Sequence, residues 1–317
     1  MRFMVLGGAG FIGSAFVRFL NSLGFRPLVF DLFTYSGRVE NLLGCNFDLI
    51  KGDVRDFNIL YNTISNFKPD VVINFAAESH VDRSIYAPQD FVSTNVLGTI
   101  NVLEAVRRFS FDYVHVSTDE VYGDDNCADE SSPLNPSSPY SASKAAGDLF
   151  VKAYVRTYGV NAIIVRPSNN YGPRQFPEKF IPKAIIRTLL GMYVPVYGDG
   201  KAERDWIFVE DTVRIIYDII KSAEWRGEVY NIPGGQRHSI LDVLKILSEV
   251  MGKEMKVKFV SDRPGHDRKY CMVSRLRYNV TPLKEGLRRT YEWYLDNKWW
   301  WESLVDDKFF REDEPWK

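Results

Sequence analysis

Residues 3–14 read FMVLGGAGFIGS, in which four apolar residues lead into a glycine-rich turn and the start of a helix. Gly8, Gly10 and Gly13 form a GxGxxG pattern, and Gly7, Gly10 and Gly13 form an overlapping GxxGxxG pattern. Between a strand and a helix, such glycines permit a tight turn and let the backbone approach a pyrophosphate group, which the helix N-terminus stabilises. This stretch therefore predicts a dinucleotide-binding unit at the start of the chain.

The rest of the first half repeats the same alternation of strand and helix. We expect strands at PLVFD, FDLIKGD, DVVINFAA, YVHVST and NAIIVRPS, and helices from about residue 14, over residues 90–109 and over residues 141–158. Short strands rich in β-branched residues, separated by helices of this length, are typical of parallel βαβ units. The predicted fold class is α/β, with a doubly wound parallel sheet of the Rossmann type.

After about residue 172 the sequence becomes richer in proline and glycine, as in YGPRQFPEKFIP and YGDGKAERDWIFVED. Shorter helices are expected near residues 182–191, 211–224 and 239–251. We therefore predict a Rossmann domain over residues 1–172, to which residues 205–232 return, and a smaller, partly interleaved substrate lobe over residues 173–317. The tail contains Trp293, Trp299, Trp300 and Trp301, and we expect an amphipathic helix docked on the body.

The composition excludes several classes of protein. With 317 residues, 45% of them hydrophobic, the chain can form a large core, and 40 basic against 41 acidic residues give no electrostatic reason to expect nucleic acid or an anionic membrane as partner. No apolar run approaches the ~20 residues that span a bilayer, so a cytoplasmic protein is expected. Cys45, Cys127 and Cys271 are too few and too far apart to predict a disulfide framework, and neither they nor the four histidines have metal-ligand spacing.

The end of the second strand indicates which dinucleotide binds. PLVFD ends on Asp31, eighteen residues past Gly13, where a carboxylate can bind ribose hydroxyls and repel the 2′-phosphate of NADP. Neither Leu32 nor Phe33 supplies the cation that NADP would need, so NAD is the predicted cofactor. The next two strands end in small or polar residues that would lie along its path, namely Asp53, Val54, Ala76 and Ala77.

A tyrosine and a lysine follow the dinucleotide unit at a spacing that suits redox chemistry. Residues 140–144 read YSASK, which puts Tyr140 and Lys144 on one face near the start of a helix. A free phenol has a pKa of ~10, so a neighbouring ammonium would favour the phenolate near neutral pH. The same lysine can hold the nicotinamide ribose of the cofactor.

Residues 114–123 read VHVSTDEVYG, so Thr118, Asp119 and Glu120 directly follow a buried strand. Alone, such an acidic pair could cap a helix or meet water. Beside a dinucleotide loop and a YxxxK pattern, the three residues instead predict a catalytic site.

Longer motifs are similar to those of one enzyme family. They are GGAGFIGS, AAESHVDRSI (76–85), STDEVYG (117–123), SSPYSASKAAGD, SNNYGPRQFPEKFIP (168–182), RDWIFVED (204–211) and DRPGHDRKY (262–270). On these motifs the chain resembles the extended short-chain dehydrogenase/reductase family of NAD-dependent epimerases and dehydratases, and within it the dTDP-glucose 4,6-dehydratase branch. The resemblance implies a lyase that converts dTDP-glucose to dTDP-4-keto-6-deoxyglucose and water for deoxysugar synthesis, with rhamnose the first expectation.

The resemblance also implies a role for each catalytic side chain. Tyr140 would take the C4 hydroxyl proton while hydride passes to NAD⁺, with Thr118 on the same oxygen and Lys144 on the ribose. Because the C4 ketone acidifies the C5 proton, Glu120 could remove that proton while a protonated Asp119 donates to the departing C6 hydroxyl, after which hydride returns to C6. A protonated Asp119 requires a pKa raised above ~3.9, which burial beside Glu120 would favour.

A nucleotide sugar needs cations for its phosphates, polar groups for its sugar and a platform for its base. The implied substrate contacts are Ser79, Thr118, Asn169, Lys179, Phe180, Pro195, Val196, Tyr197, Arg204, Asn231, Asp262, Arg263, Pro264, Gly265 and His266. The implied further cofactor contacts are Phe11, Ile12, Thr34, Phe75, Thr94 and Asn170.

Other functions stay open on the same scaffold. A UDP-sugar 4,6-dehydratase differs by one methyl group on the base, worth only ~1–3 kcal/mol in an apolar pocket. A nucleotide-sugar epimerase or decarboxylase would not need the acidic pair, and a non-catalytic dinucleotide sensor would not need the five catalytic side chains together. The family also implies a homodimer in which residues 90–109 and 141–158 of each subunit form a four-helix bundle.

Overall fold

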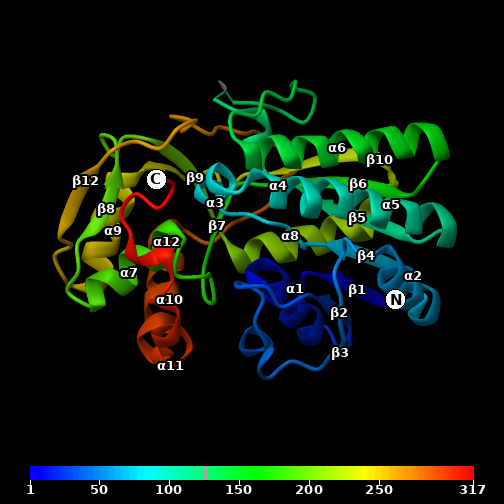
Figure 1. The fold of residues 1–317 in the computed structure, drawn as a ribbon, viewed down its shortest axis with the longest axis horizontal. Coiled ribbons are helices and arrows are strands. Elements are labelled where there is room, and N and C mark those ends of the chain that lie inside the picture. Colours follow the sequence, from blue (N-terminus) through cyan, green and yellow to red (C-terminus); the bar gives the residue numbers. More distant parts are fainter. Residues whose placement is uncertain (125–126) are drawn as a thin grey trace.

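The computed structural model of the protein describes residues 1–124 and 127–317. Its larger part is a seven-stranded sheet in the order β10-β6-β5-β4-β1-β2-β3, in which all neighbouring strands are parallel (Figure 1). The strands are β1 (Phe3–Leu6), β2 (Leu28–Asp31), β3 (Asp48–Lys51), β4 (Val71–Asn74), β5 (Asp112–Val116), β6 (Ala162–Pro167) and β10 (Arg226–Ile232). The predicted Rossmann-type sheet is confirmed.

Helices cover both faces of this sheet, and successive strand residues point to opposite faces. Phe3 and Val5 of β1 pack in one core with α1 (Phe11–Ser22) and α8 (Val209–Ser222). Met4 and Leu6 pack in a second core with α2 (Phe57–Phe67), α5 (Gly98–Phe109) and α6 (Pro139–Tyr158). Because helices cover both faces, the side chains on both sides of each central strand are buried, which explains why these strands are continuous apolar runs in the sequence. Shorter elements are η1 (Val39–Leu42), α3 (Val81–Tyr86), α4 (Pro88–Phe91), the π-helical η2 (Val92–Leu97) and η3 (Asp119–Tyr122).

The smaller part has its own core and two small sheets. One sheet has the order β11-β9-β7, and in the other β12 pairs with β8. The strands are β7 (Asn169–Tyr171), β8 (Val194–Tyr197), β9 (Glu203–Phe208), β11 (Arg237–Ser239) and β12 (Val257–Val260). The helices are α7 (Phe180–Leu189), α9 (Ile240–Met251), α10 (Leu283–Asp296), α11 (Lys298–Trp301), η4 (Glu302–Leu304) and α12 (Lys308–Arg311).

The two parts are interleaved along the chain. After β9 the chain returns through α8 to the main sheet, where β10 pairs with β6 at the edge. β11, α9 and β12 lie again in the smaller part, the segment around residues 272–280 runs back beside the main sheet, and α10 returns to the smaller part (Figure 1). The domain boundary at residue 172 stays a prediction.

The tryptophan-rich tail is docked on the body. Trp300 and Trp301 are buried, whereas Trp299 is 54% exposed. The indole N–H of Trp300 donates to the side-chain oxygen of Asn41 at 2.9 Å, and that of Trp301 donates to the carbonyl oxygen of Tyr294 at 2.8 Å. Most of the aromatic material therefore serves packing, as expected.

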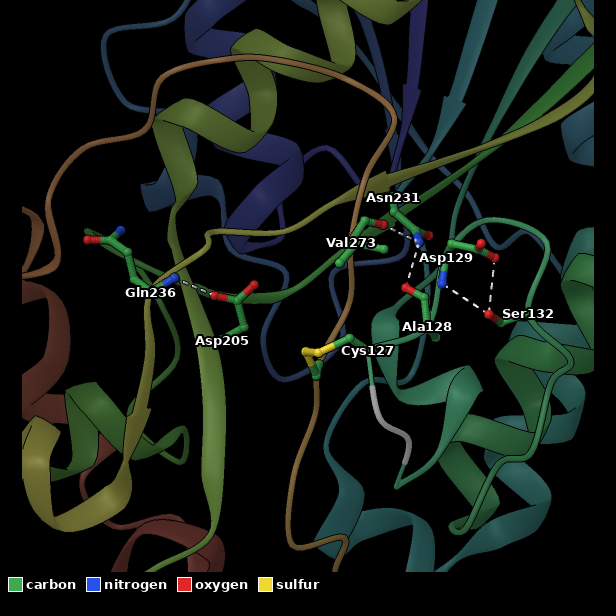
Figure 2. Close-up of a disulfide and its surroundings, with 9 residues drawn as sticks. Cys127, Ala128, Asp129, Ser132, Asp205, Asn231, Gln236 and Val273 are labelled. Carbon is green, nitrogen blue, oxygen red and sulfur yellow. Dashed lines mark hydrogen bonds between the residues drawn. A yellow bond between two sulfur atoms is a disulfide. The ribbon is translucent and has the colours of Figure 1, made fainter.

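The cysteines were expected to be too few and too far apart for a disulfide framework, and this expectation missed one disulfide. Cys127 and Cys271 form a disulfide with their Cα atoms 4.2 Å apart (Figure 2). They are 144 residues apart in the sequence, but Ala128 and Met272, which follow them, pair as a parallel bridge. Sequence spacing fails here because two loops from distant parts of the chain meet beside the main sheet. Cys45 is a free thiol.

Candidate active site

A cavity of about 300 Å³ lies beyond the carboxyl ends of β1, β5 and β6, where the main sheet meets the smaller part. Open parallel sheets bind ligands at this edge. Residues predicted from the sequence make up much of its lining, namely Phe11, Ile12, Ser79, Thr118, Asp119, Glu120, Tyr140, Asn169, Asn170, Lys179, Phe180, Pro195, Tyr197, Arg204, Arg263 and His266.

The acidic pair lies in η3, a short 3₁₀ turn directly after β5. The Thr118 hydroxyl caps this turn by accepting a hydrogen bond from the backbone N–H of Glu120 at 3.3 Å, and it donates to Asp119 Oδ1 at 3.2 Å. The Asp119 side chain is buried, and its Oδ2 has no hydrogen-bond partner among the residues that the structure describes. A buried carboxyl oxygen without a partner disfavours the charged form.

The two acids differ in their electrostatic surroundings. Burial raises the pKa of Asp119 well above its ordinary value, and the adjacent charge of Glu120 raises it further. Burial also raises the pKa of Glu120, but there the positive charges of Arg263, Arg204 and Lys179 oppose the rise. Neighbouring groups whose surroundings push their pKa values apart are suited to opposite proton-transfer roles, here Asp119 as acid and Glu120 as base.

A layer of polar residues behind Glu120 was missed by the sequence reasoning. The Tyr270 hydroxyl donates to Asp267 Oδ2 at 2.6 Å, and its oxygen lies 3.4 Å from Glu120 Oε2. The Arg204 guanidinium lies 4.3 Å from the centre of the Tyr270 ring and donates to the Asp267 carbonyl oxygen at 2.9 Å. The motif DRPGHDRKY contains both missed residues, but only the fold brings them to the end of β5.

The tyrosine and lysine are positioned by the start of α6. Ser138 and Ser141 form a capping box there, which places Tyr140 in the first helical turn and Lys144 one turn later. Lys144 Nζ donates to the carbonyl oxygen of Val116, at the end of β5, at 2.5 Å. Burial raises the pKa of Tyr140 and lowers the pKa of Lys144 to about 8. The ammonium is bound to the strand end, and the phenol keeps its proton in these surroundings.

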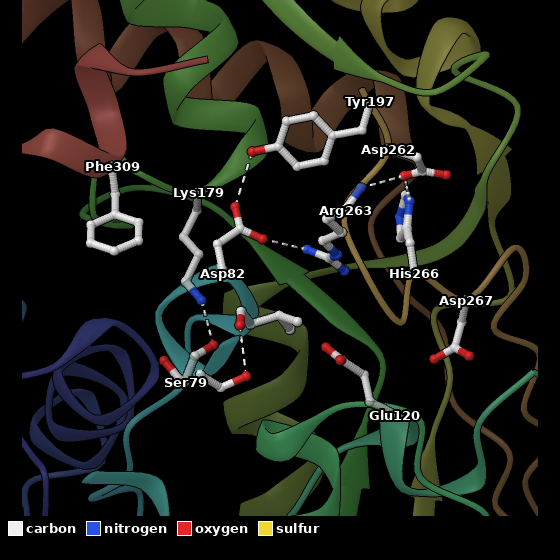
Figure 3. Close-up of polar contacts among 12 residues, drawn as sticks. Ser79, Asp82, Glu120, Lys179, Tyr197, Asp262, Arg263, His266, Asp267 and Phe309 are labelled. Atoms are coloured by element: carbon white, nitrogen blue, oxygen red, sulfur yellow. Dashed lines mark hydrogen bonds and ion pairs between the residues drawn. The ribbon is translucent and has the colours of Figure 1, made fainter. Parts of the chain in front are cut away.

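Ion pairs and hydrogen bonds organise the opposite wall of the cavity (Figure 3). The buried carboxylate of Asp82 accepts a hydrogen bond from the Tyr197 hydroxyl at 2.9 Å and pairs with Arg263 Nη1 at 3.1 Å. Lys179 Nζ donates to the carbonyl oxygen of Ser79 at 2.6 Å. Asp82 was not singled out from the sequence, although it lies in the motif AAESHVDRSI.

A second cavity, of about 90 Å³, follows the glycine loop. Predicted cofactor contacts line it, namely Gly7, Gly10, Asp31, Leu32, Thr34, Asp53, Val54, Phe75, Ala76, Ala77 and Thr94. Arg55 also lines it, in an ion pair with Asp53 at 2.6 Å, and was not predicted.

The loop geometry fits a dinucleotide. Gly7 has φ +70°, and a Cβ there would lie 2.5 Å from the backbone nitrogen of Ala76. Asp31 accepts hydrogen bonds from the backbone N–H groups of Ala9 and Phe33, each at 2.8 Å. A side-chain-free loop beside a fixed carboxylate is the arrangement that pyrophosphate and ribose require.

Some predicted residues lie outside both cavity linings, namely Gly13, Phe33, Lys144, Val196, Asn231, Asp262, Pro264 and Gly265. Val196 packs in the core of the smaller part. The buried amide of Asn231 accepts from the Tyr122 hydroxyl at 2.8 Å and donates to the Val273 carbonyl oxygen at 2.9 Å (Figure 2), so it holds the disulfide-bonded segment in place. Asp262 Oδ1 lies 2.6 Å from Nδ1 of His266, whose pKa burial lowers to about 4.

Residues 1–124 and 127–317 are the part of the chain that the structure describes. That part of the chain contains no cluster of three or more His, Cys, Asp or Glu side chains arranged to bind a metal ion. None of its helices is both long enough and apolar enough to cross a membrane.

Comparisons with known proteins agree with this geometry. The family model of GDP-mannose 4,6 dehydratase matches residues 4–281. A dTDP-glucose 4,6-dehydratase of Neisseria meningitidis serogroup B is 40% identical to the chain over 97% of both proteins. DesIV, a dTDP-glucose 4,6-dehydratase from Streptomyces venezuelae whose crystal structure contains NAD, superposes with a TM-score of 0.91 at 41% identity, over 96% of this chain and 100% of that one.

Epimerases share the same fold. A UDP-glucose 4-epimerase from Thermotoga maritima, solved with UDP-glucose, superposes with a TM-score of 0.88 at 29% identity, over 94% of this chain and 100% of that one. The chain belongs to the GDP-mannose 4,6 dehydratase family. Within it, the resemblance to dTDP-glucose 4,6-dehydratase indicated by the sequence motifs is confirmed.

Proposed function

We propose that the protein is an NAD-dependent dTDP-glucose 4,6-dehydratase that forms dTDP-4-keto-6-deoxyglucose and water. The observation that carries the proposal is the pair of adjacent carboxyl groups at the end of β5. One is buried with a raised pKa, and the other lies among three cations. Redox chemistry at C4 alone would not need this pair, whereas elimination of water needs both an acid and a base.

NAD fits the second cavity and the adjoining glycine loop. Gly7 and Gly10 leave room for the pyrophosphate, and Asp31 is placed to accept hydrogen bonds from ribose hydroxyls. When bound, NAD⁺ accepts hydride from C4 of the sugar and later returns it to C6. Lys144 lies one helical turn beyond Tyr140 and is suited to holding the nicotinamide ribose.

The first proton transfer falls to Tyr140, which lines the larger cavity beside Thr118. The phenol oxygen takes the proton of the C4 hydroxyl, and the Thr118 hydroxyl binds the same sugar oxygen. Burial raises the pKa of Tyr140, so the tyrosine needs a nearby positive charge to stabilise its phenolate form. The positive charge of a bound nicotinamide ring would oppose this rise in pKa, and Lys144 lies one helical turn further along α6.

The elimination uses the acidic pair. Glu120, held among the cations, removes the C5 proton once C4 is a ketone. Burial and the neighbouring charge of Glu120 raise the pKa of Asp119 and so favour its protonated form, which donates its proton to the departing C6 hydroxyl. Lys179, Arg204 and Arg263 supply positive charge for the diphosphate.

Incubation with sugar nucleotides tests the proposal. Wild-type protein should remove the mass of one water from intact dTDP-glucose and little from UDP-glucose, while a Tyr140→Phe control should be inactive. Dehydration of UDP-glucose instead would assign the protein to the UDP-sugar dehydratases. An epimer without loss of mass would contradict the dehydratase proposal.

We also propose that the protein is a cytoplasmic homodimer. The exposed apolar side chains Val92 and Leu97 of η2, and Leu149 and Phe150 of α6, support a helical interface between subunits. Light scattering should give the mass of a dimer, and Leu149→Asp should shift it toward a monomer. A monomeric wild-type protein would contradict the dimer, and recovery with a membrane fraction would contradict the location.

A further inference from the structure

Tyr197, on the rim of the larger cavity, is fixed by contacts on three sides. Its hydroxyl donates to Asp82 at 2.9 Å (Figure 3). The imidazole of His266 meets its ring edge to face, with centroids 6.4 Å apart. The indole of Trp316 also meets it edge to face, with centroids 4.7 Å apart and planes at 80°. Of these three neighbours, only Trp316 lies outside the cavity lining.

The C-terminal segment that carries Trp316 is anchored independently of this aromatic contact. Asp313 pairs with Arg187 at 2.7 Å and with Lys258 at 2.8 Å. Lys183, on the same helix as Arg187, donates to the carbonyl oxygen of Phe309 at 2.8 Å. Loss of the Trp316 ring should therefore leave the segment docked and remove only the support behind Tyr197.

We propose that Trp316 is a positioning residue for the nucleotide part of the substrate. It holds the Tyr197 ring at the cavity rim, where the ring can act as a platform for the base of a pyrimidine nucleoside diphosphate. This inference rests on the proposed function, because it assumes that a nucleotide sugar occupies the cavity. A ring that is already fixed loses less conformational freedom on binding, so the ligand binds more tightly.

Asp82 connects the Tyr197 ring, which would support the base, to the Arg263 guanidinium, which would bind the diphosphate. Asp82 binds both the Tyr197 hydroxyl and Arg263 Nη1, so one carboxylate sets the position of both groups (Figure 3). Trp316 contacts the Tyr197 ring from outside the cavity lining, whereas Asp119 and Glu120 belong to that lining. Loss of Trp316 should weaken nucleotide binding and leave the chemical steps unchanged.

Kinetics of tryptophan variants test the proposal. Trp316→Ala should raise both the KM for dTDP-glucose and the Kd for thymidine diphosphate by roughly 3- to 10-fold, the range expected for loss of one aromatic pair. The kcat should stay within about twofold, because no catalytic group is touched. Trp316→Phe, which keeps a ring edge, should restore wild-type binding, whereas Trp316→Leu should behave like Trp316→Ala. The matched control is Trp299→Ala, which removes an exposed tryptophan of the same tail.

Several outcomes would overturn the proposal. Wild-type Kd and KM in Trp316→Ala would do so, as would a lower kcat with unchanged KM. Equal Kd values for Trp316→Leu and Trp316→Phe would also overturn the proposal. This comparison tests the proposal even if the alanine variant does not fold. The calorimetric Kd for thymidine diphosphate requires no turnover, so failure of the proposed function would appear separately, as absence of dTDP-glucose dehydration by the wild type.

Discussion

Replacement of Asp119 by Asn should separate the oxidation of C4 from the loss of water. Asp119 is buried, and one of its carboxyl oxygens has no hydrogen-bond partner within residues 1–124 and 127–317. Burial raises its pKa, which favours the neutral acid. Asn has nearly the same shape and charge as this neutral acid, so the fold and the surroundings of Glu120 should be retained. It cannot give up a proton to the C6 hydroxyl. General acid catalysis contributes roughly 10²–10⁴-fold, so elimination should slow by that factor, about 3 to 5 kcal/mol in activation free energy.

A single-turnover experiment would measure both steps. Enzyme loaded with NAD⁺ is mixed with less than one equivalent of dTDP-glucose, NADH absorbance is followed, and quenched samples are analysed for loss of water. In Asp119→Asn, NADH should form at close to the wild-type rate and then stay at the level set by equilibrium with the C4 alcohol, because hydride can reach C6 only after elimination.

The matched control for this experiment is Glu120→Gln. In heavy water, Asp119→Asn should still exchange the C5 proton of the oxidised sugar, and Glu120→Gln should not. Dehydration by Asp119→Asn at the wild-type rate would refute the acid assignment. Failure of that variant to form NADH would show that Asp119 serves the oxidation step instead.

Three further predictions concern stability and the cofactor. Folding raises the pKa of Asp119, so the stability contributed by this group is complete below its unfolded-state pKa of ~3.9 and is lost as pH rises through its folded-state pKa. Thermal melts should therefore show Asp119→Asn more stable than wild type at alkaline pH and equal to it below pH ~4. The disulfide closes a loop of 144 residues, so Cys127→Ser should lower the free energy of unfolding by about 4–5 kcal/mol in denaturant titrations, with Cys45→Ser as the unchanged control. Asp31→Ala should weaken NAD⁺ binding by roughly tenfold or more and reduce the preference over NADP, as titration calorimetry can show; unchanged selectivity would contradict its placement against the ribose.

The sequence predicted the main sheet well because local patterns determine it. The run FMVLGGAGFIGS carries its strand, turn and helix signals within twelve residues, and the later strands repeat the apolar pattern of a sheet buried on both faces. The acidic pair was found in the same way, because Asp119 and Glu120 directly follow such a strand. Their raised pKa values were less predictable, since burial and the nearby cations come from other parts of the chain.

The remaining features depend on contacts between distant residues. Nothing near Cys127 in the sequence indicates that Cys271 lies beside it. Asn231 was predicted as a substrate contact, yet it lies in β10 and its amide is occupied by the backbone next to the disulfide. Asp82 and Tyr270 were overlooked for a similar reason, because the contacts of Asp82 with Tyr197 and of Tyr270 with Glu120 join residues more than 100 positions apart.

The fate of the hydrogen on C4 tests the central claim most directly. The protein would be incubated with dTDP-glucose carrying deuterium at C4, and the position of the label in the product would be read by NMR and mass spectrometry. If C4 is oxidised, water is eliminated across C5 and C6, and hydride returns to C6, the deuterium should appear in the C6 methyl group of a product lighter by one water. Deuterium retained at C4 of an unchanged or epimerised sugar would contradict the account.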